Sequence, residues 1–110
     1  MSDITKARNA IVARILEGDG TASHAQRRAA FDNTGLAEPL STLIDKLTRH
    51  AFKVNDADIA AARTSGFSQD QIFEIVICGA IGQATRQYDN ALAALEAARA
   101  STEHAPRDPQ

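Results

Sequence analysis

The chain has 110 residues, of which 44% are hydrophobic and 24% charged, a composition typical of one small globular domain. A formal net charge of −2 at pH 7 argues against nucleic acid as the main partner, because binding it normally needs a concentrated basic face. The single cysteine excludes an internal disulfide, a Cys-x-x-Cys redox pair and a cysteine-based zinc site. The sequence shows no apolar signal segment and no apolar run of about 20 residues, so we expect a cytoplasmic location and no membrane partner.

Two short helices are predicted at the N-terminal end. The first covers residues 1–17, where apolar residues recur at helical spacing, and a glycine-rich turn ends it. Ser23 with Gln26 three positions later forms a capping box for the second helix, which runs through about Asn33. Gly35 is expected to stop this second helix.

A third and a fourth helix are predicted in the middle of the chain. Pro39 suits the first position of the third helix, because its missing N–H costs nothing there. The apolar face of this helix consists of Leu40, Leu43, Ile44, Leu47 and Ala51. Asn55 and Asp56 then cap a fourth helix through Ser65, which Gly66 closes.

The fifth predicted helix is long, starting at the capping box of Ser68 and Gln71 and reaching about Ala100. One apolar stripe along it consists of Phe73, Ile77, Ala80, Ala84, Tyr88, Ala91 and Leu95. A second stripe consists of Ile72, Ile75, Gly79 and Gly82. Because glycine in a helix costs up to about 1 kcal/mol relative to alanine, Gly79 and Gly82 predict the close approach of a neighbouring helix.

The expected architecture is therefore all-α, with about five helices in a single domain of residues 1–100. Residues 101–110 are polar and proline-punctuated, and we expect them to be disordered. A small alanine-rich domain buries little area by itself, and its long helix is apolar nearly all round. Both features predict a homo-oligomer.

Residues 40–95 resemble the helical unit of the carboxymuconolactone decarboxylase family, which includes the alkylhydroperoxidase AhpD-like proteins. The resemblance lies in the GFSQDQIFEI turn and cap, the alanine-rich helix before it and the small-residue helix after it. It covers about half of the chain. It implies an AhpD-like fold whose sites lie where helices of neighbouring subunits meet.

The redox branch of that family uses a Cys-x-x-Cys pair followed by a histidine. Counting back from Gly66, these positions correspond to about Ala51, Val54 and Asp58. Neither alanine nor valine can replace a thiolate as a nucleophile. The chain thus resembles a divergent member of the family that lacks the cysteine pair, and alkylhydroperoxidase-type antioxidant chemistry is not expected.

The remaining cysteine and the basic residues favour structural roles. Cys78 lies within the apolar helix, where burial keeps it a thiol, so we expect a packed core residue. Two groups of basic residues are expected on solvated helix faces: Arg27 with Arg28, and Lys46 with Arg49 and Lys53. The three histidines, His24, His50 and His104, have no ligand spacing, so neither a metal nor a cofactor is expected.

Three residues are candidates for chemistry: His50, Glu74 and Arg86. Both His50 and Glu74 also have a structural explanation. His50 lies in the last turn of a predicted helix and Glu74 in the first turns of another, and each interacts favourably with the helix dipole there. Arg86 follows the apolar run, where it either pairs at a subunit interface or binds an anion, with the Tyr88 hydroxyl at the same level.

Two functions follow from these candidates. The first is a non-redox helical homo-oligomer with a structural or small-ligand-binding role. The alternative is a cofactor-free acid–base enzyme resembling the decarboxylase branch, in which Arg86 holds a small carboxylated substrate while His50 or Glu74 moves protons. A pocket that holds at least two of the three residues would favour the enzyme. An accessory role beside another protein has no positive support in the sequence.

Overall fold

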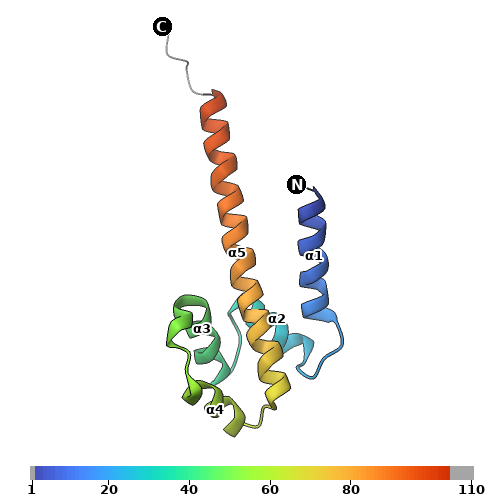
Figure 1. The fold of residues 1–110 in the computed structure, drawn as a ribbon, viewed down its shortest axis with the longest axis vertical. Helices are drawn as coiled ribbons and strands as arrows, with labels where there is room; N and C mark the ends of the chain where they lie inside the picture. The colour runs from blue at the N-terminus through green and yellow to red at the C-terminus, as the bar shows by residue number, and fades with distance from the viewer. Residues whose placement is uncertain (1, 105–110) are drawn as a thin grey trace.

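The computed structural model describes residues 2–104, and this part of the chain is all-helical, without a strand. Five α-helices and one 3-10 turn follow one another in the order predicted (Figure 1). Their bounds are α1 Ser2–Glu17, α2 His24–Asp32, α3 Leu40–His50, η1 Ala51–Lys53, α4 Asp56–Thr64 and α5 Gln69–His104. The all-α class and the long C-terminal helix are confirmed.

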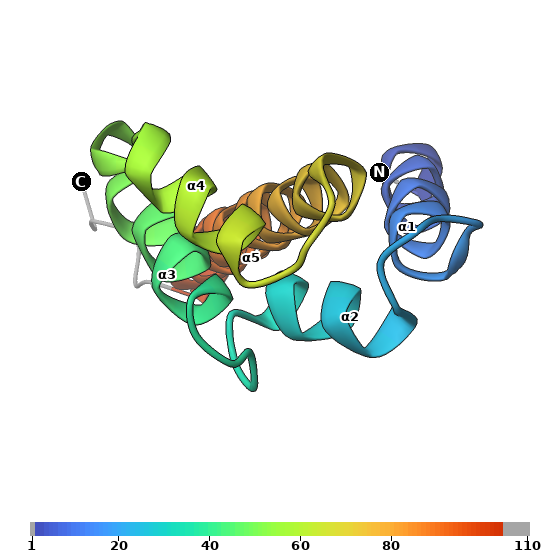
Figure 2. The ribbon, with the colours of Figure 1, turned by 90° about the horizontal axis from the view of Figure 1, so that it is seen from below.

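Helix α5 is the axis of the fold. Its 36 residues span about 54 Å at 1.5 Å per residue. The helices α2, α3 and α4 surround its N-terminal part, α1 runs antiparallel beside it, and its C-terminal part extends beyond them (Figure 1). Seen from below, α1 and α4 lie on opposite sides of α5 (Figure 2). No helix among residues 2–104 is both long enough and apolar enough to span a bilayer.

Local capping sets the starts of α2 and α5 as predicted, whereas Pro39 precedes α3 as its N-cap residue and does not occupy its first position. The Ser23 hydroxyl accepts from the backbone N–H of Gln26, and the Gln26 side chain accepts in return from Ser23. The same reciprocal pair occurs between Ser68 and Gln71, where α5 begins. These bonds satisfy N–H groups that have no partner inside the helix, so each start is specified within four residues.

Two predicted helix ends differ from the structure. Asn33 ends α2 in the left-handed conformation, with φ of 51°, two residues before the expected Gly35. Its side chain donates to Asp45 Oδ1 at 3.3 Å and to Thr48 Oγ1 at 3.1 Å, both in α3. Helix α5 continues to His104, four residues beyond the expected Ala100. Residues 105–110 of the expected tail lie outside the described residues.

The two helical glycines mark the closest helix contacts, as predicted. A Cβ on Gly82 would lie 2.0 Å from the carbonyl oxygen of Phe31, so α2 packs directly on the α5 backbone. A Cβ on Gly79 would lie 3.2 Å from methyl groups of Ile44 in α3. The core therefore forms on this side of α5, around the fully buried Ile75.

The other apolar stripe of α5 is not part of this core. We name it the α5 stripe, and it consists of Phe73, Ile77, Ala80, Ala84, Tyr88, Ala91 and Leu95. Phe73 is 64% exposed and Leu95 is 63% exposed. In the single chain α2 and α3 cover the glycine side of α5, and α1 lies beside Ile81 and Thr85, whereas both ends of the α5 stripe stay exposed.

Arg27 corrects a second expectation. It is only 4% exposed, and its guanidinium donates to three backbone carbonyls, those of Ile15, Gly18 and Ala22, at 3.2, 2.7 and 3.1 Å. Ile15 lies in the last turn of α1 and Gly18 follows the helix, so Arg27 joins the end of α1 to α2. Its neighbour Arg28 is solvated as expected and forms a loose ion pair with Asp32 at 3.8 Å.

Candidate functional site

The segment from Ala51 to Asp58, which corresponds to the redox site in the family that the sequence resembles, has a structural role in this chain. Ala51 begins the 3-10 turn and is exposed, and Val54 is half-buried. The Asp58 carboxylate accepts from the backbone N–H of Asn55 at 3.0 Å and from Lys46 Nζ at 2.8 Å. These hydrogen bonds lower the pKa of Asp58 and keep it charged, so it caps α4 and pairs α4 with α3.

Cys78 is a core residue and is only 1% exposed. Burial raises the pKa of its thiol, and the Sγ atom lies 3.7 Å from the carbonyl oxygen of Ile15, to which it can donate weakly. Both the low exposure and the protonated state oppose nucleophilic reactivity. The packing role predicted for Cys78 agrees with this position.

His50 is the last residue of α3 and is exposed. Its ring packs edge-on against Phe52, with 5.9 Å between centroids. Phe52 is 82% exposed, so this ring pair lies on the surface at the turn between α3 and α4. His50 therefore faces neither of the other two candidate residues.

Glu74 binds the turn that precedes α2. Its carboxylate accepts from the backbone N–H of Thr21 at 3.0 and 2.9 Å, from the Thr21 hydroxyl, and from the N–H of Ala22 at 3.4 Å. The Thr21 hydrogen bonds are the main reason that the pKa of Glu74 is lowered. A carboxylate that accepts several N–H bonds is a poor proton donor at neutral pH, so its position favours a structural role.

Gly20 explains how the turn reaches Glu74. A Cβ at this position would lie 2.0 Å from Glu74 Oε1. Only glycine therefore fits beside the carboxylate without displacing it. The sequence did indicate the glycine-rich turn. It did not indicate that Glu74 binds this turn, because Glu74 lies 53 residues after Thr21 and no local pattern connects them.

Arg86 is half-buried where α5 crosses the end of α2. Its Nη1 donates to the carbonyl oxygen of Phe31 at 2.5 Å, and its Nη2 to Gln83 Oε1 at 3.1 Å. The carbonyl it binds is the same one that lies against Gly82. Arg86 thus binds backbone within one chain, and Tyr88 lies on a different side of α5, beside Arg8.

A polar cavity of about 370 Å³ lies beside Arg86. Its lining comes from the ends of α2 and α3 and from α5, and consists of Asp32, Asn33, Thr48, Arg49, Gln83 and Arg86. Arg49 is already paired with Asp45 at 2.7 Å, and this pairing lowers the pKa of Asp45. The cavity holds one of the three predicted residues, since neither His50 nor Glu74 lines it.

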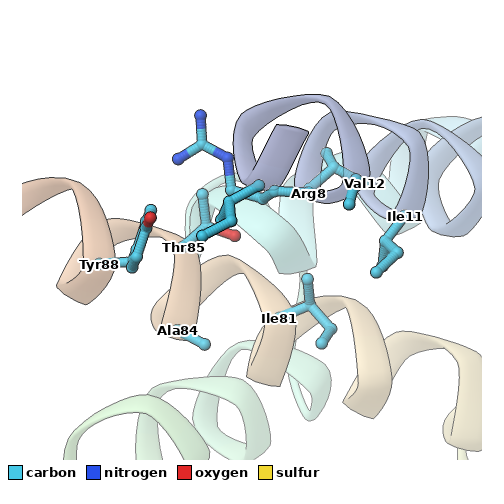
Figure 3. Close-up of a pocket in the computed structure, with 9 residues that line it drawn as sticks. Arg8, Ile11, Val12, Ile81, Ala84, Thr85 and Tyr88 are labelled. Atoms are coloured by element: carbon cyan, nitrogen blue, oxygen red, sulfur yellow. The ribbon is translucent and has the colours of Figure 1, made fainter. Parts of the chain in front are cut away.

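A second cavity is apolar and lies between α1 and α5 (Figure 3). It has a volume of about 380 Å³ and is lined by Ile4, Ala7, Arg8, Ile11, Val12, Ile81, Ala84, Thr85 and Tyr88. Arg8 closes one end by pairing with Asp89 of α5 and lying over the Tyr88 ring. The periodicity of the sequence indicated the apolar faces of α1 and α5. It did not indicate that a groove would remain between these two helices.

Among the described residues, the three candidates for chemistry occupy three separate places. No group of three or more His, Cys, Asp or Glu side chains in that part of the chain could hold a metal ion. The comparisons with known proteins find no similar family model, curated protein or solved structure.

Proposed function

We propose that this protein is a non-redox, divergent member of the AhpD-like fold that works in the cytoplasm as a homo-oligomer with a structural or small-ligand-binding role. The order of the α3 helix, the α4 helix, the Gly66 turn and the small-residue helix α5 supports this fold assignment. The observation that carries the non-redox part is the state of the only thiol, since Cys78 is 1% exposed with a raised pKa.

Self-association is supported by the surface that the single chain leaves uncovered. Four large apolar side chains of α1 and α5 are more than half exposed: Ile4 at 54%, Ile11 at 53%, Phe73 at 64% and Leu95 at 63%. Exposed apolar surface that gathers into a patch marks an interaction site, and Ile4 and Ile11 lie at the apolar groove between α1 and α5. Covering it with further copies of the chain would complete the burial that the composition predicts.

The redox part is tested by peroxide consumption with a dithiol donor, comparing the wild type with Cys78→Ala. We expect no turnover above the buffer background from either protein. Cys78 should also resist a thiol reagent in the native state and react rapidly in urea, because burial protects it. Peroxide consumption that disappears in Cys78→Ala would overturn this part of the proposal.

A second candidate role is the binding of a small carboxylate in the polar cavity. The supporting observation is that two arginines, Arg49 and Arg86, line this cavity and outnumber its one carboxylate, that of Asp32. Guanidinium groups bind carboxylates with charge-assisted hydrogen bonds. The acid–base enzyme has less support, because its proposed proton carriers lie outside this cavity.

Titration with small mono- and dicarboxylates, followed by amide NMR shifts, tests this role. We expect saturable shifts at Thr48 and Gln83 that are absent in Arg86→Met and retained in the control Arg28→Met, whose side chain is solvated. Absent shifts, or equal shifts in both variants, would contradict carboxylate binding.

A further inference from the structure

The residues of the α5 stripe are spaced symmetrically about Ala84. Its members lie at matching distances on either side of Ala84: Phe73 and Leu95 eleven residues away, Ile77 and Ala91 seven, and Ala80 and Tyr88 four. At 3.6 residues per turn, all of them fall within about 40° of Ala84 around the helix. The spacing is therefore the same whether α5 is followed forwards or backwards.

A surface with this symmetry matches an antiparallel copy of itself. A two-fold axis at the level of Ala84 brings Phe73 of one copy to Leu95 of the other, and Ile77 to Ala91. Nearer the centre a large side chain meets a small one, since Ile77 meets Ala91 and Tyr88 meets Ala80. At the centre Ala84 faces Ala84, which lets the helices approach closely. Isologous contacts of this type are the rule in two-fold dimers.

Charges beside the stripe fit the same arrangement. Asp70 lies fourteen residues before Ala84 and Arg99 fifteen residues after it. Both fall about 40° to 60° from the centre of the stripe, on the same side. An antiparallel pair therefore places Asp70 of each copy beside Arg99 of the other, as flanking ion pairs do in coiled coils.

Helix α1 extends the same face. Ile81 and Ala84 of α5 line the apolar groove together with Ile11, so Ile11 lies near the level of the proposed axis (Figure 3). Ile4 and Ile11 are seven residues apart and both more than half exposed. A second α1–α5 pair laid on this groove makes a four-helix arrangement, with the groove as its interior.

The available area agrees with a two-chain interface. The stripe is about 33 Å long and α1 about 24 Å, so at a helix width of about 10 Å they offer roughly 600 Å² per copy. Two copies then bury roughly 1,200 Å², which is at the lower end for specific interfaces. The pairing should accordingly depend on protein concentration.

We propose that a second copy of this chain covers the α5 stripe and the α1–α5 groove in an antiparallel, two-fold contact centred at Ala84. This inference rests on the proposed self-association and names the surface that performs it. It assigns the exposed Phe73 and Leu95 to one contact, although they lie at opposite ends of the stripe.

Sedimentation velocity of the full chain over a range of concentrations tests the surface. Ala84→Glu places two carboxylates against each other across the axis, so we expect the dimer dissociation constant to rise at least about tenfold. Ala93→Glu is the matched control, because Ala93 is exposed on the same helix but about 180° from Ala84. It should leave the dimer unchanged, and far-ultraviolet circular dichroism should show both variants folded.

Cysteine cross-linking tests the geometry independently of stability. Ala84→Cys should form an intermolecular disulfide under mild oxidation, because the two-fold contact brings the two positions together. Ala91→Cys should not, because the two copies of position 91 would lie about 21 Å apart, beyond disulfide reach. In a parallel pair both positions would cross-link, which would overturn the proposal.

The outcomes separate this inference from the proposed function. A wild type that stays monomeric at every concentration refutes self-association and the inference together. An oligomer that persists in Ala84→Glu and fails to cross-link through Ala84→Cys refutes only the surface proposed here. Loss of the dimer in Ala84→Glu, retention in Ala93→Glu and selective cross-linking at position 84 support both.

Discussion

Replacing Gly82 with alanine tests how closely α2 packs on α5. The new Cβ would lie 2.0 Å from the oxygen, 2.7 Å from the carbonyl carbon and 2.8 Å from the Cα of Phe31. Ordinary contact begins at 3.4 Å, so the two helices would have to separate by more than 1 Å. Backbone atoms cannot rotate away as a flexible side chain can.

Three contributions set the size of the effect. Overpacking costs about 1–3 kcal/mol, and weakening the bond from Arg86 to the Phe31 carbonyl adds about 1.5 kcal/mol. The higher helix propensity of alanine offsets about 1 kcal/mol of this destabilisation. The net loss is about 1.5–3.5 kcal/mol of unfolding free energy, or about 10 °C in Tm for a domain of this size.

Urea unfolding followed by circular dichroism measures this loss, at equal protein concentration because self-association would add to stability. Gly79→Ala is the matched control, since its Cβ would meet only side-chain atoms of Ile44 and Leu47 at 3.2–3.3 Å. It should stay within about 1 kcal/mol of the wild type. Equal stability of the two variants would refute the close packing of α2 on Gly82.

Two further variants test polar contacts of the core. Arg27→Met removes the guanidinium donor from three backbone carbonyls, of which, among the described residues, only that of Ile15 keeps a weak contact with the Cys78 thiol. It should cost about 3 kcal/mol in urea unfolding, whereas Arg28→Met should change stability by less than about 0.5 kcal/mol. Similar losses in both would show that Arg27 is not a core donor. Glu74→Gln should destabilise the protein at neutral pH. Because the folded pKa of Glu74 is lowered from 4.5, its contribution is present above that pH and is lost as the pH falls through the folded value. The difference in unfolding free energy between the wild type and Glu74→Gln, measured between pH 7 and pH 3, should therefore shrink below about pH 4.5. A difference that stays constant over this range would contradict the Thr21 hydrogen bonds as its cause.

The local sequence determines where the helices of this protein begin. The pairs Ser23–Gln26 and Ser68–Gln71 specify their helix starts because each cap acts within four residues along the chain. Gly79 and Gly82 likewise indicated close helix contacts, since a glycine inside a helix needs a compensating reason. The absence of the family's cysteine pair is also a property of the sequence alone.

Only the tertiary structure decided which side of each helix is covered. Both stripes of α5 are apolar, so periodicity could not show that α2 and α3 pack on the glycine side and leave Phe73 exposed. Arg27 and Arg28 are identical in type and adjacent, yet only Arg27 meets the end of α1. Burial and long-range hydrogen bonds depend on which helix arrives from elsewhere in the chain, and no local pattern contains that information.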